Sequence, residues 1–367
     1  MRDMNTMRLT ELYAEQGPFA TAMLDVSHDS GNGQQEHALR VRAARESLLE
    51  QGAPEEVVDR VTARLEQLVG QPAPVARTVV ASTNGVLLDD VSHFRVDTPV
   101  ASWSPLPDLT RWIEHQDALT PFVLAVVDHE GGDVAVYESD VPEPTQQQSV
   151  GEPSHREHKV PTGGWSALRY QHVTENVWAR NAEAVADEII GHVRKGVRLV
   201  LLAADPQSLP TVRARLEDSP ATVVELDTGT RARDGGDEAM QQAIREALME
   251  HAAARRLADV HVLKDRLGMD TAVATGVGDI ADAFVRGQVD TLLIDPQAAA
   301  GFTLDVAKHP GLVLPAAVTE TELPADQALV AAAVITSAEV RVAPGAALGG
   351  VPAAALLRWD QKQMSST

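Results

Sequence analysis

The chain has 367 residues, of which 44% are hydrophobic and 23% charged, and its formal net charge is -22. This composition is typical of a folded protein with two or three domains and excludes a fibrous or disordered chain. The acidic balance argues against nonspecific binding to DNA, and the absence of cysteine excludes disulfides and thiolate metal sites. No apolar run is long enough to span a bilayer and the first residues lack a signal core, so we expect a cytoplasmic protein that binds no membrane.

Residues 1–118 predict a first domain of α/β type. It begins with a helix and a strand, continues with two helices, and ends with two strands that meet at Asn84 and Gly85, because Asn-Gly between apolar runs is a strong hairpin signal. In chain order, these elements are expected at 1–16, 19–26, 36–52, 54–69, 77–82 and 85–90.

Residues 119–235 predict a second domain, which is α/β and carries a long loop. Two strands form a hairpin with a Gly-containing turn, and a polar loop rich in Pro and Gln then precedes a long amphipathic helix and two buried strands. In chain order, the strands and the helix are expected at 121–128, 133–138, 172–195, 197–205 and 221–226.

Residues 236–367 predict a third domain of α/β type. We expect a long helix, a short helix and a strand, and then three strands in the runs ALVAAAVIT, AEVRVA and AAALLRW. In chain order, these elements are expected at 237–267, 280–287, 289–295, 328–336, 338–343 and 353–359.

The end of the long polar loop, KVPTGGWSALRYQH at 159–172, has the residue types of an RNA contact. Gly163 and Gly164 permit close backbone approach, and Trp165 offers a ring on which a base can stack. Basic side chains outnumber acidic ones around this segment, so it can meet phosphates despite the acidic chain. These side chains are Arg156, Lys159 and Arg169, with His155 and His158 beside them. The simpler alternative is that Trp165 packs on the core of its own domain.

The frame GGWSALRY, followed by a long helix and the strand VRLVLLAADP, resembles the central domain of the archaeo-eukaryotic class-1 release factors and Pelota. In that family Gly-Gly-Gln precedes Ser-Ala-x-Arg and a long helix. IADAFVRGQVDTLLI and GALGGVPAAALLRWD resemble segments of the family's third domain, so the resemblance covers roughly 119–360. It implies a three-domain, release-factor-like architecture whose last domain is similar to ribosomal protein L7Ae.

Two departures from that family bear on function. Trp165 stands where the family has its catalytic glutamine, and an indole, which has one donor and no acceptor, cannot orient a water in the same way. The first domain also lacks the family's stop-codon-reading sequence. The chain is therefore identified as similar to the Balon-like hibernation factors, the bacterial branch of this superfamily, and its opening GPFATAMLDVSHD fits the actinobacterial type.

That resemblance implies noncatalytic binding to the vacant A site of idle 70S ribosomes, from the decoding centre on 16S rRNA to the peptidyl transferase centre on 23S rRNA. Elongation factor Tu is a candidate delivery partner, and no catalytic residue, cofactor or metal is expected. The implied ribosome-binding residues are His155, Arg156, His158, Lys159, Thr162, Gly163, Gly164, Trp165, Ser166 and Arg169.

Several alternatives stay open. Ribosome rescue as by Pelota and hydrolysis of peptidyl-tRNA through another residue both fit the same frame. Gly276, Gly278 and Ala281, with Asp295 further on, imitate a dinucleotide-binding fingerprint. Asp25, His28 and Asp29 could form a metal or acid-base site, although a polar turn is the simpler interpretation. His155 and His158 alone make a weak metal site.

Overall fold

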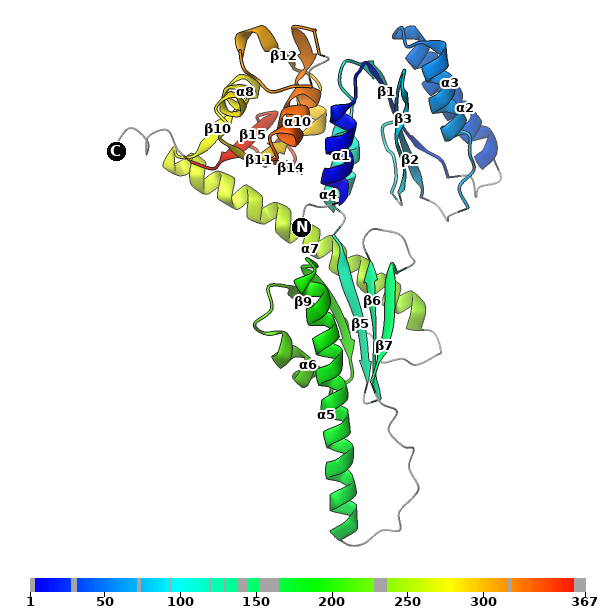
Figure 1. Cartoon of the computed structure of the whole chain (residues 1–367), viewed down its shortest axis with the longest axis vertical. Coiled ribbons are helices and arrows are strands. Elements are labelled where there is room, and N and C mark those ends of the chain that lie inside the picture. Colours follow the sequence, from blue (N-terminus) through cyan, green and yellow to red (C-terminus); the bar gives the residue numbers. More distant parts are fainter. Residues whose placement is uncertain are drawn as a thin grey trace. The chain divides into compact units, whose positions relative to one another are not determined.

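The computed structural model describes residues 4–27, 32–70, 74–92, 94–118, 120–128, 130–137, 144–151, 165–227, 236–315 and 318–359. The chain divides into two compact units, each described here by itself. Unit 1 is Leu119–Ala253, and unit 2 is Arg2–Ala118 together with Ala254–Thr367. Both units contain β-sheet and helices, which confirms the predicted α/β class (Figure 1).

Unit 1 is a sheet of strand order β7-β6-β5-β8-β9 with helices on both faces. Strands β5, β8 and β9 run parallel, β6 is antiparallel to β5, and β7 is antiparallel to β6. The predicted hairpin of β5 and β6 is therefore confirmed. Its elements are β5 (Phe122–Asp128), β6 (Gly131–Tyr137), β7 (Gln146–Val150), α5 (Trp165–Arg194), β8 (Leu199–Ala204), α6 (Leu209–Leu216), β9 (Thr222–Glu225) and the first part of α7 (Gly236–Met269).

Alternation along the strands of unit 1 creates two apolar layers. Val123, like the other odd-numbered apolar residues of β5, packs toward α5 and α6, whereas Phe122 packs toward the first part of α7. Neighbouring side chains on a strand point to opposite faces, so a sheet covered on both sides reads as a continuous apolar run. That is why PFVLAVVD and VRLVLLAAD are recognisable as buried strands.

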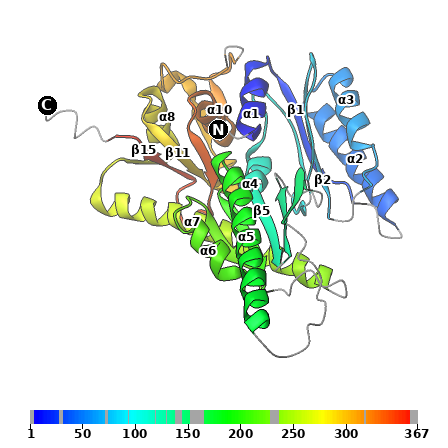
Figure 2. The ribbon, with the colours of Figure 1, turned by 60° about the horizontal axis from the view of Figure 1, so that its bottom comes forward.

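Unit 2 contains an antiparallel sheet of order β3-β2-β1-β4, built from the first part of the chain. Helices α2 and α3 cover one face of this sheet (Figures 1 and 2). The predicted Asn-Gly hairpin is confirmed between β2 and β3, with Gly85 at φ 147°. The elements are α1 (Met4–Ala14), β1 (Phe19–Asp25), α2 (Gly33–Glu50), α3 (Glu55–Leu65), β2 (Ala76–Ser82), β3 (Gly85–Ser92), β4 (Val100–Ser104) and α4 (Thr110–Ala118).

A second sheet of unit 2, with order β10-β15-β11-β14, comes from the last part of the chain. Helices α8 and α10 pack on one face of it and the second part of α7 on the other. The elements are β10 (Val273–Thr275), α8 (Val277–Val285), β11 (Val289–Ile294), α9 (Pro296–Ala299), β12 (Thr303–Asp305), the 3-10 helix η1 (Val306–Lys308), β13 (Glu322–Pro324), α10 (Ala325–Ile335), β14 (Glu339–Val342) and β15 (Ala353–Leu357).

One hydrophobic core joins the first and last parts of the chain. Leu12 of α1 and Trp112 of α4 belong to the same buried cluster as Phe284 of α8 and Leu329 of α10. Thr110 and Ser104 also hydrogen-bond to side chains of α10. The blocks predicted as the first and third domains thus lie in one compact unit, while the three-domain division itself stays a prediction.

Two element predictions are wrong. Residues 146–150, expected within the polar loop, form strand β7, which pairs with β6. The run ALVAAAVIT, expected as a strand, lies in helix α10, whose residues Ala325 to Val334 are all buried. A helix that is covered on every side shows no amphipathic period, so a short apolar run cannot be assigned by periodicity. The alanine content, which favours helix over strand, is the signal that decides the matter.

Candidate functional site

The predicted contact residues lie between strand β7 and the first turns of helix α5. Seven of them, from His155 to Gly164, fall outside the residues that the structure describes. Trp165, Ser166 and Arg169 belong to the helical backbone of α5, but their side chains are also outside the described part. Their contacts with RNA therefore stay a prediction, and the scaffold that carries them can be described.

Helix α5 is much longer than the sheet on which it packs. Its 30 residues rise about 45 Å, whereas the 7 residues of β5 span about 23 Å. Among the described side chains of α5, burial begins at Asn181 and recurs at Val185, Ile189 and Val193. Residues 165–180 precede these contacts and rise about 24 Å. The first half of α5 therefore extends past the sheet (Figure 1).

Two glycines stand at the base of the segment that leads to this helix. Gly131 begins β6 and Gly151 follows β7, with φ of 138° and 130°. A Cβ on Gly151 would lie 2.6 Å from the Cα of Gly131, and one on Gly131 would collide with the carbonyl oxygen of Val150. Only glycine tolerates both the backbone conformation and the close approach. The two glycines thereby fix the path of the chain where it leaves the sheet.

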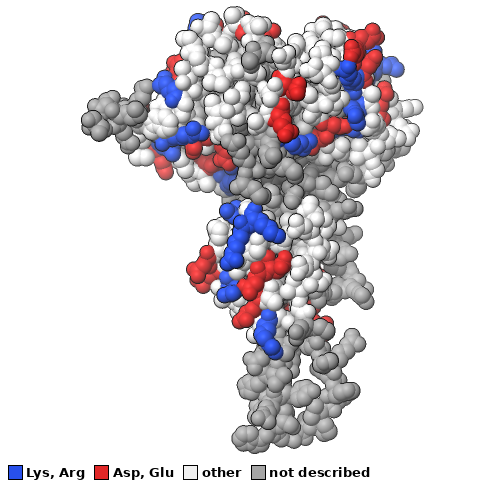
Figure 3. All heavy atoms as spheres, viewed as in Figure 1, with Lys and Arg blue, Asp and Glu red and all other residues white. Residues whose placement is uncertain are grey.

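On the described surface of unit 1, basic side chains form ion pairs with acidic ones and do not gather in a patch of one charge. Arg215 on α6 lies 2.9 Å from the carboxylate of Asp187 on α5, and Arg213 lies 3.0 Å from that of Glu225. Basic and acidic side chains accordingly lie beside one another on the face of this unit visible in Figure 3. That the basic segment identified in the sequence attracts phosphate stays a prediction.

The dinucleotide-binding interpretation does not fit the topology. Strands β10 and β11 flank helix α8, but β15 lies between them and runs antiparallel to both. A dinucleotide fingerprint requires the two strands to be parallel neighbours. Asp295, the residue expected on a ribose, instead accepts hydrogen bonds from the backbone N–H groups of Ala298 (2.9 Å) and Gly345 (2.6 Å). It therefore caps α9 and holds a loop.

The polar turn after β1 matches the simpler interpretation. Asp25 accepts a hydrogen bond from the backbone N–H of Ser27 at 2.8 Å, and Arg40 approaches it at 3.9 Å. His28 and Asp29 lie outside the described residues. Within the part of the chain that the structure describes, no group of three or more His, Asp or Glu could hold a metal ion.

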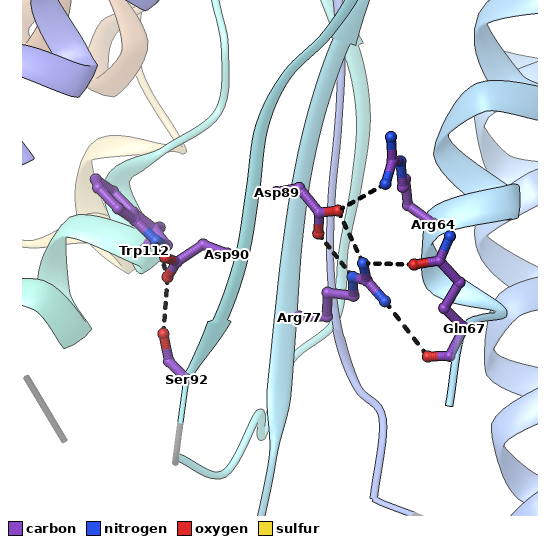
Figure 4. A network of polar contacts seen from close by, with 7 residues as sticks. All are labelled: Arg64, Gln67, Arg77, Asp89, Asp90, Ser92 and Trp112. Carbon is purple, nitrogen blue, oxygen red and sulfur yellow. Dashed lines mark hydrogen bonds and ion pairs between the residues drawn. The ribbon is translucent and has the colours of Figure 1, made fainter. Parts of the chain in front are cut away.

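Two adjacent acidic residues on β3 accept hydrogen bonds on opposite faces of the first sheet of unit 2 (Figure 4). The sequence analysis did not identify this network. Asp89 receives two hydrogen bonds from the guanidinium of the buried Arg77, at 2.7 and 2.8 Å. Asp90 accepts from the indole N–H of Trp112 at 3.0 Å and from Arg8 at 3.0 Å. The signal was the pair Asp-Asp inside a strand, because consecutive side chains must face opposite sides.

A second missed feature is a buried acidic cluster near α4 and α10 in unit 2. Burial and, secondarily, the carboxylate of Asp326 raise the pKa of Asp108 to about 6. Burial also raises the pKa of Asp326, whose carboxylate accepts a hydrogen bond from Thr110 at 3.0 Å. The pKa of Tyr13 is raised by burial and by the same two carboxylates. These groups lie inside unit 2 and affect its stability, since the charged form of each acid is disfavoured there.

Among the described residues, no helix is at once long enough and apolar enough to cross a membrane.

One family model matches part of this chain. Residues 121–269 match the family described as bacterial archaeo-eukaryotic release factor family 2. The uncharacterized proteins MT2704 and Rv2629 of Mycobacterium tuberculosis are each 28% identical over 303 residues, which is 79% of this chain and 78% of theirs.

Similar solved structures come from archaea and yeast. One is ribosome-bound archaeal Pelota with ABCE1, at 14% identity and a TM-score of 0.40, covering 97% of this chain and 94% of that one. Another is the translation termination-like factor Dom34 of S. cerevisiae, described as interacting with Hbs1, at 9% identity and a TM-score of 0.40, covering 78% and 80%.

The family match contains the motif frame GGWSALRY and the whole of α5, so the predicted superfamily is supported for this segment. The hibernation subtype stays a prediction. From strand β5 to the end of helix α7, the chain is thus similar to the bacterial archaeo-eukaryotic release factors of family 2.

Proposed function

We propose that this protein is a ribosome hibernation factor, which occupies the vacant A site of idle 70S ribosomes without hydrolysing peptidyl-tRNA. The observation that carries the proposal is the match of 121–269 to a release factor family in a chain that has Trp165 in place of the family's catalytic glutamine. An indole cannot accept a hydrogen bond from water, so the chemistry of release is missing while the frame that presents the loop is kept.

The scaffold of unit 1 supports a reaching role for this loop. Helix α5 extends past the sheet at its N-terminal end (Figure 1), and Gly131 and Gly151 fix where the chain leaves the sheet. A long helix anchored at one end is suited to hold a contact residue away from an acidic body. We propose that Trp165 stacks on a base of 23S rRNA and that Arg156 and Lys159 bind phosphates near it.

The remaining partners follow from the same proposal. The predicted first domain, residues 1–118, would contact the small subunit near the decoding centre on 16S rRNA, and elongation factor Tu would act as the delivery factor. The protein would work in the cytoplasm, where idle ribosomes are found.

Rescue of stalled ribosomes is the second candidate, because the family resemblance includes Pelota, which also lacks Gly-Gly-Gln. Both functions need an empty A site and no hydrolysis. They differ in consequence, since a rescue factor promotes subunit dissociation with a partner whereas a hibernation factor leaves the 70S particle intact.

The test is cosedimentation of the purified full chain with vacant 70S ribosomes at low and high salt, with and without elongation factor Tu. We expect binding that weakens with salt through counterion release and that weakens further in Trp165→Ala. The matched control is Trp359→Ala, which removes a partly exposed tryptophan of unit 2. Equal loss in both variants would contradict a contact at the loop, and salt-independent binding would contradict the phosphate contacts.

Release of labelled peptide separates the proposal from an enzyme. With a ribosome complex that carries peptidyl-tRNA, we expect occupancy of the ribosome and no peptide release above background. Catalytic turnover would refute the noncatalytic assignment, and accumulation of free subunits with intact peptidyl-tRNA would favour rescue.

A further inference from the structure

A pocket of about 320 Å³ lies within unit 2 and is independent of the loop and of the proposed function. Its walls come from four separate parts of the chain: Met23 of β1, the connection between β3 and β4, helix α4, and the second part of α7. The volume is in the range of small-molecule sites. The lining includes Phe94, Arg95, Arg111, Glu114, His115 and Arg256.

The pocket concentrates arginine in a chain that is strongly acidic overall. Arg95 is paired with Asp97 at 3.3 Å and Arg111 with Glu114 at 3.1 Å. Arg256 has no ion pair with a carboxylate of the described residues, and its Nε atom is buried without a hydrogen-bond partner there. A buried guanidinium N–H without an acceptor is costly, and an anion with two acceptor oxygens, such as a phosphate, can satisfy a guanidinium with two parallel hydrogen bonds. An anion bound in the pocket would therefore supply the acceptor that the Nε–H group of Arg256 lacks.

The pocket also has a flat aromatic wall. The rings of Phe94 and His115 are stacked, with centroids 3.7 Å apart and planes at 21°. Both side chains are only partly buried, so the pair presents aromatic surface to the cavity. Aromatic surface next to guanidinium groups is the combination by which proteins bind a nucleobase and the phosphate attached to it.

We propose that this pocket binds a nucleoside monophosphate, with the base against the Phe94–His115 pair and the phosphate on Arg256 and Arg111. The same chemistry is available from a free mononucleotide or from one nucleotide of a single-stranded RNA. Arg111 would bind the phosphate while keeping its ion pair with Glu114. Arg256 is the cation whose charge the phosphate would neutralise. No covalent step is involved.

The test is isothermal titration calorimetry of the purified full chain with AMP, GMP, CMP and UMP, with adenosine and inorganic phosphate as the separate halves, and with a single-stranded hexauridylate RNA. We expect a nucleotide to bind more tightly than either half. In Arg256→Gln the affinity should fall at least about tenfold, because a charge-assisted hydrogen bond is lost. Phe94→Leu should weaken the nucleotide but not inorganic phosphate.

The matched control is Arg245→Gln, which removes an exposed arginine of the same helix outside the pocket and should leave affinity unchanged. Binding of the hexanucleotide without any mononucleotide, lost in Arg256→Gln, would assign the site to RNA as the source of the nucleotide. Absence of binding by all probes overturns the proposal, as does binding that Arg256→Gln and Arg245→Gln weaken equally. Equal affinity for nucleotide and phosphate, unaffected by Phe94→Leu, overturns the base contact.

Discussion

Replacing Asp108 by asparagine should stabilise unit 2 near neutral pH. The carboxyl of Asp108 is mostly buried beside a second acid, which raises its pKa from an ordinary value of 3.8 to about 6. The folded state therefore favours the protonated form. The stability that this form contributes is fully present below pH 3.8 and is lost as the pH rises through about 6.

The magnitude follows from the two pKa values. The difference between 3.8 in the unfolded chain and about 6 in the folded protein corresponds to about 3 kcal/mol of unfolding free energy lost by neutral pH. Asparagine resembles the protonated acid in shape and cannot ionise. Asp108→Asn should consequently recover up to about 3 kcal/mol near pH 7.5 and much less near pH 4. The backbone N–H of residue 108, which donates to Thr21, is unchanged by the substitution.

Urea unfolding followed by tryptophan fluorescence measures this effect in unit 2. A background with Trp165→Phe and Trp178→Phe leaves tryptophan only in unit 2, so the two units can be told apart. Glu50→Gln is the control, since it removes an exposed carboxyl of α2 and should act equally at both pH values. A variant that is no more stable than its parent near pH 7.5, or a gain that does not depend on pH, would refute the reasoning.

Three further substitutions test the packing described above by urea unfolding, which is followed by the tryptophan fluorescence of unit 2 for its two sites and by amide hydrogen exchange of β6 and β7 for Gly151. Gly151→Ala should destabilise unit 1 by roughly 1–3 kcal/mol, because it strains the backbone and brings a Cβ too close to Gly131. An unchanged stability of unit 1 would contradict the close approach of these two glycines. Arg77→Ala should cost unit 2 about 3 kcal/mol because it leaves the carboxylate of Asp89 without its buried partner; restoration by Asp89→Ala in the double variant would identify that cause. Leu263→Ala removes a fully buried side chain of α7 and should cost about 2–5 kcal/mol, whereas Leu257→Ala, on an exposed position of the same helix, should change stability by less than about 0.5 kcal/mol.

The sequence predicts most local structure of this chain. Four of the five strands of unit 1 (β5, β6, β8 and β9), the hairpin at Asn84 and the long helices α5 and α7 follow from local periodicity and turn chemistry, whereas β7 lies in a stretch expected as loop. The misassigned α10 shows where that reasoning ends, because a helix buried on every side has no periodic signal.

Long-range arrangement could not be predicted in the same way. The core that joins Trp112 to Leu329, and the pocket that joins Phe94 to Arg256, depend on segments far apart in the sequence. Asp295 is instructive because its spacing fits a ribose ligand, while its hydrogen bonds reveal a helix cap. For the loop itself, the sequence supplies the residues and the structure supplies their support, which is the projecting helix α5.

Helix α7 has a consequence for how this protein unfolds and how it can be divided. Its early residues, such as Ile244 and Ala247, pack in the core of unit 1, while Val260 and Leu263 pack in that of unit 2. Of the two points at which the chain passes between the units, the one at Ala253 and Ala254 thus lies inside helix α7. A cut within α7 would separate its apolar residues from the core on which they pack, and helical pieces shorter than about 12–15 residues are marginal in water without packing. We therefore expect that a proteolytic cut within α7 leaves neither fragment with a complete core. Unfolding of either unit should fray the helix toward the other.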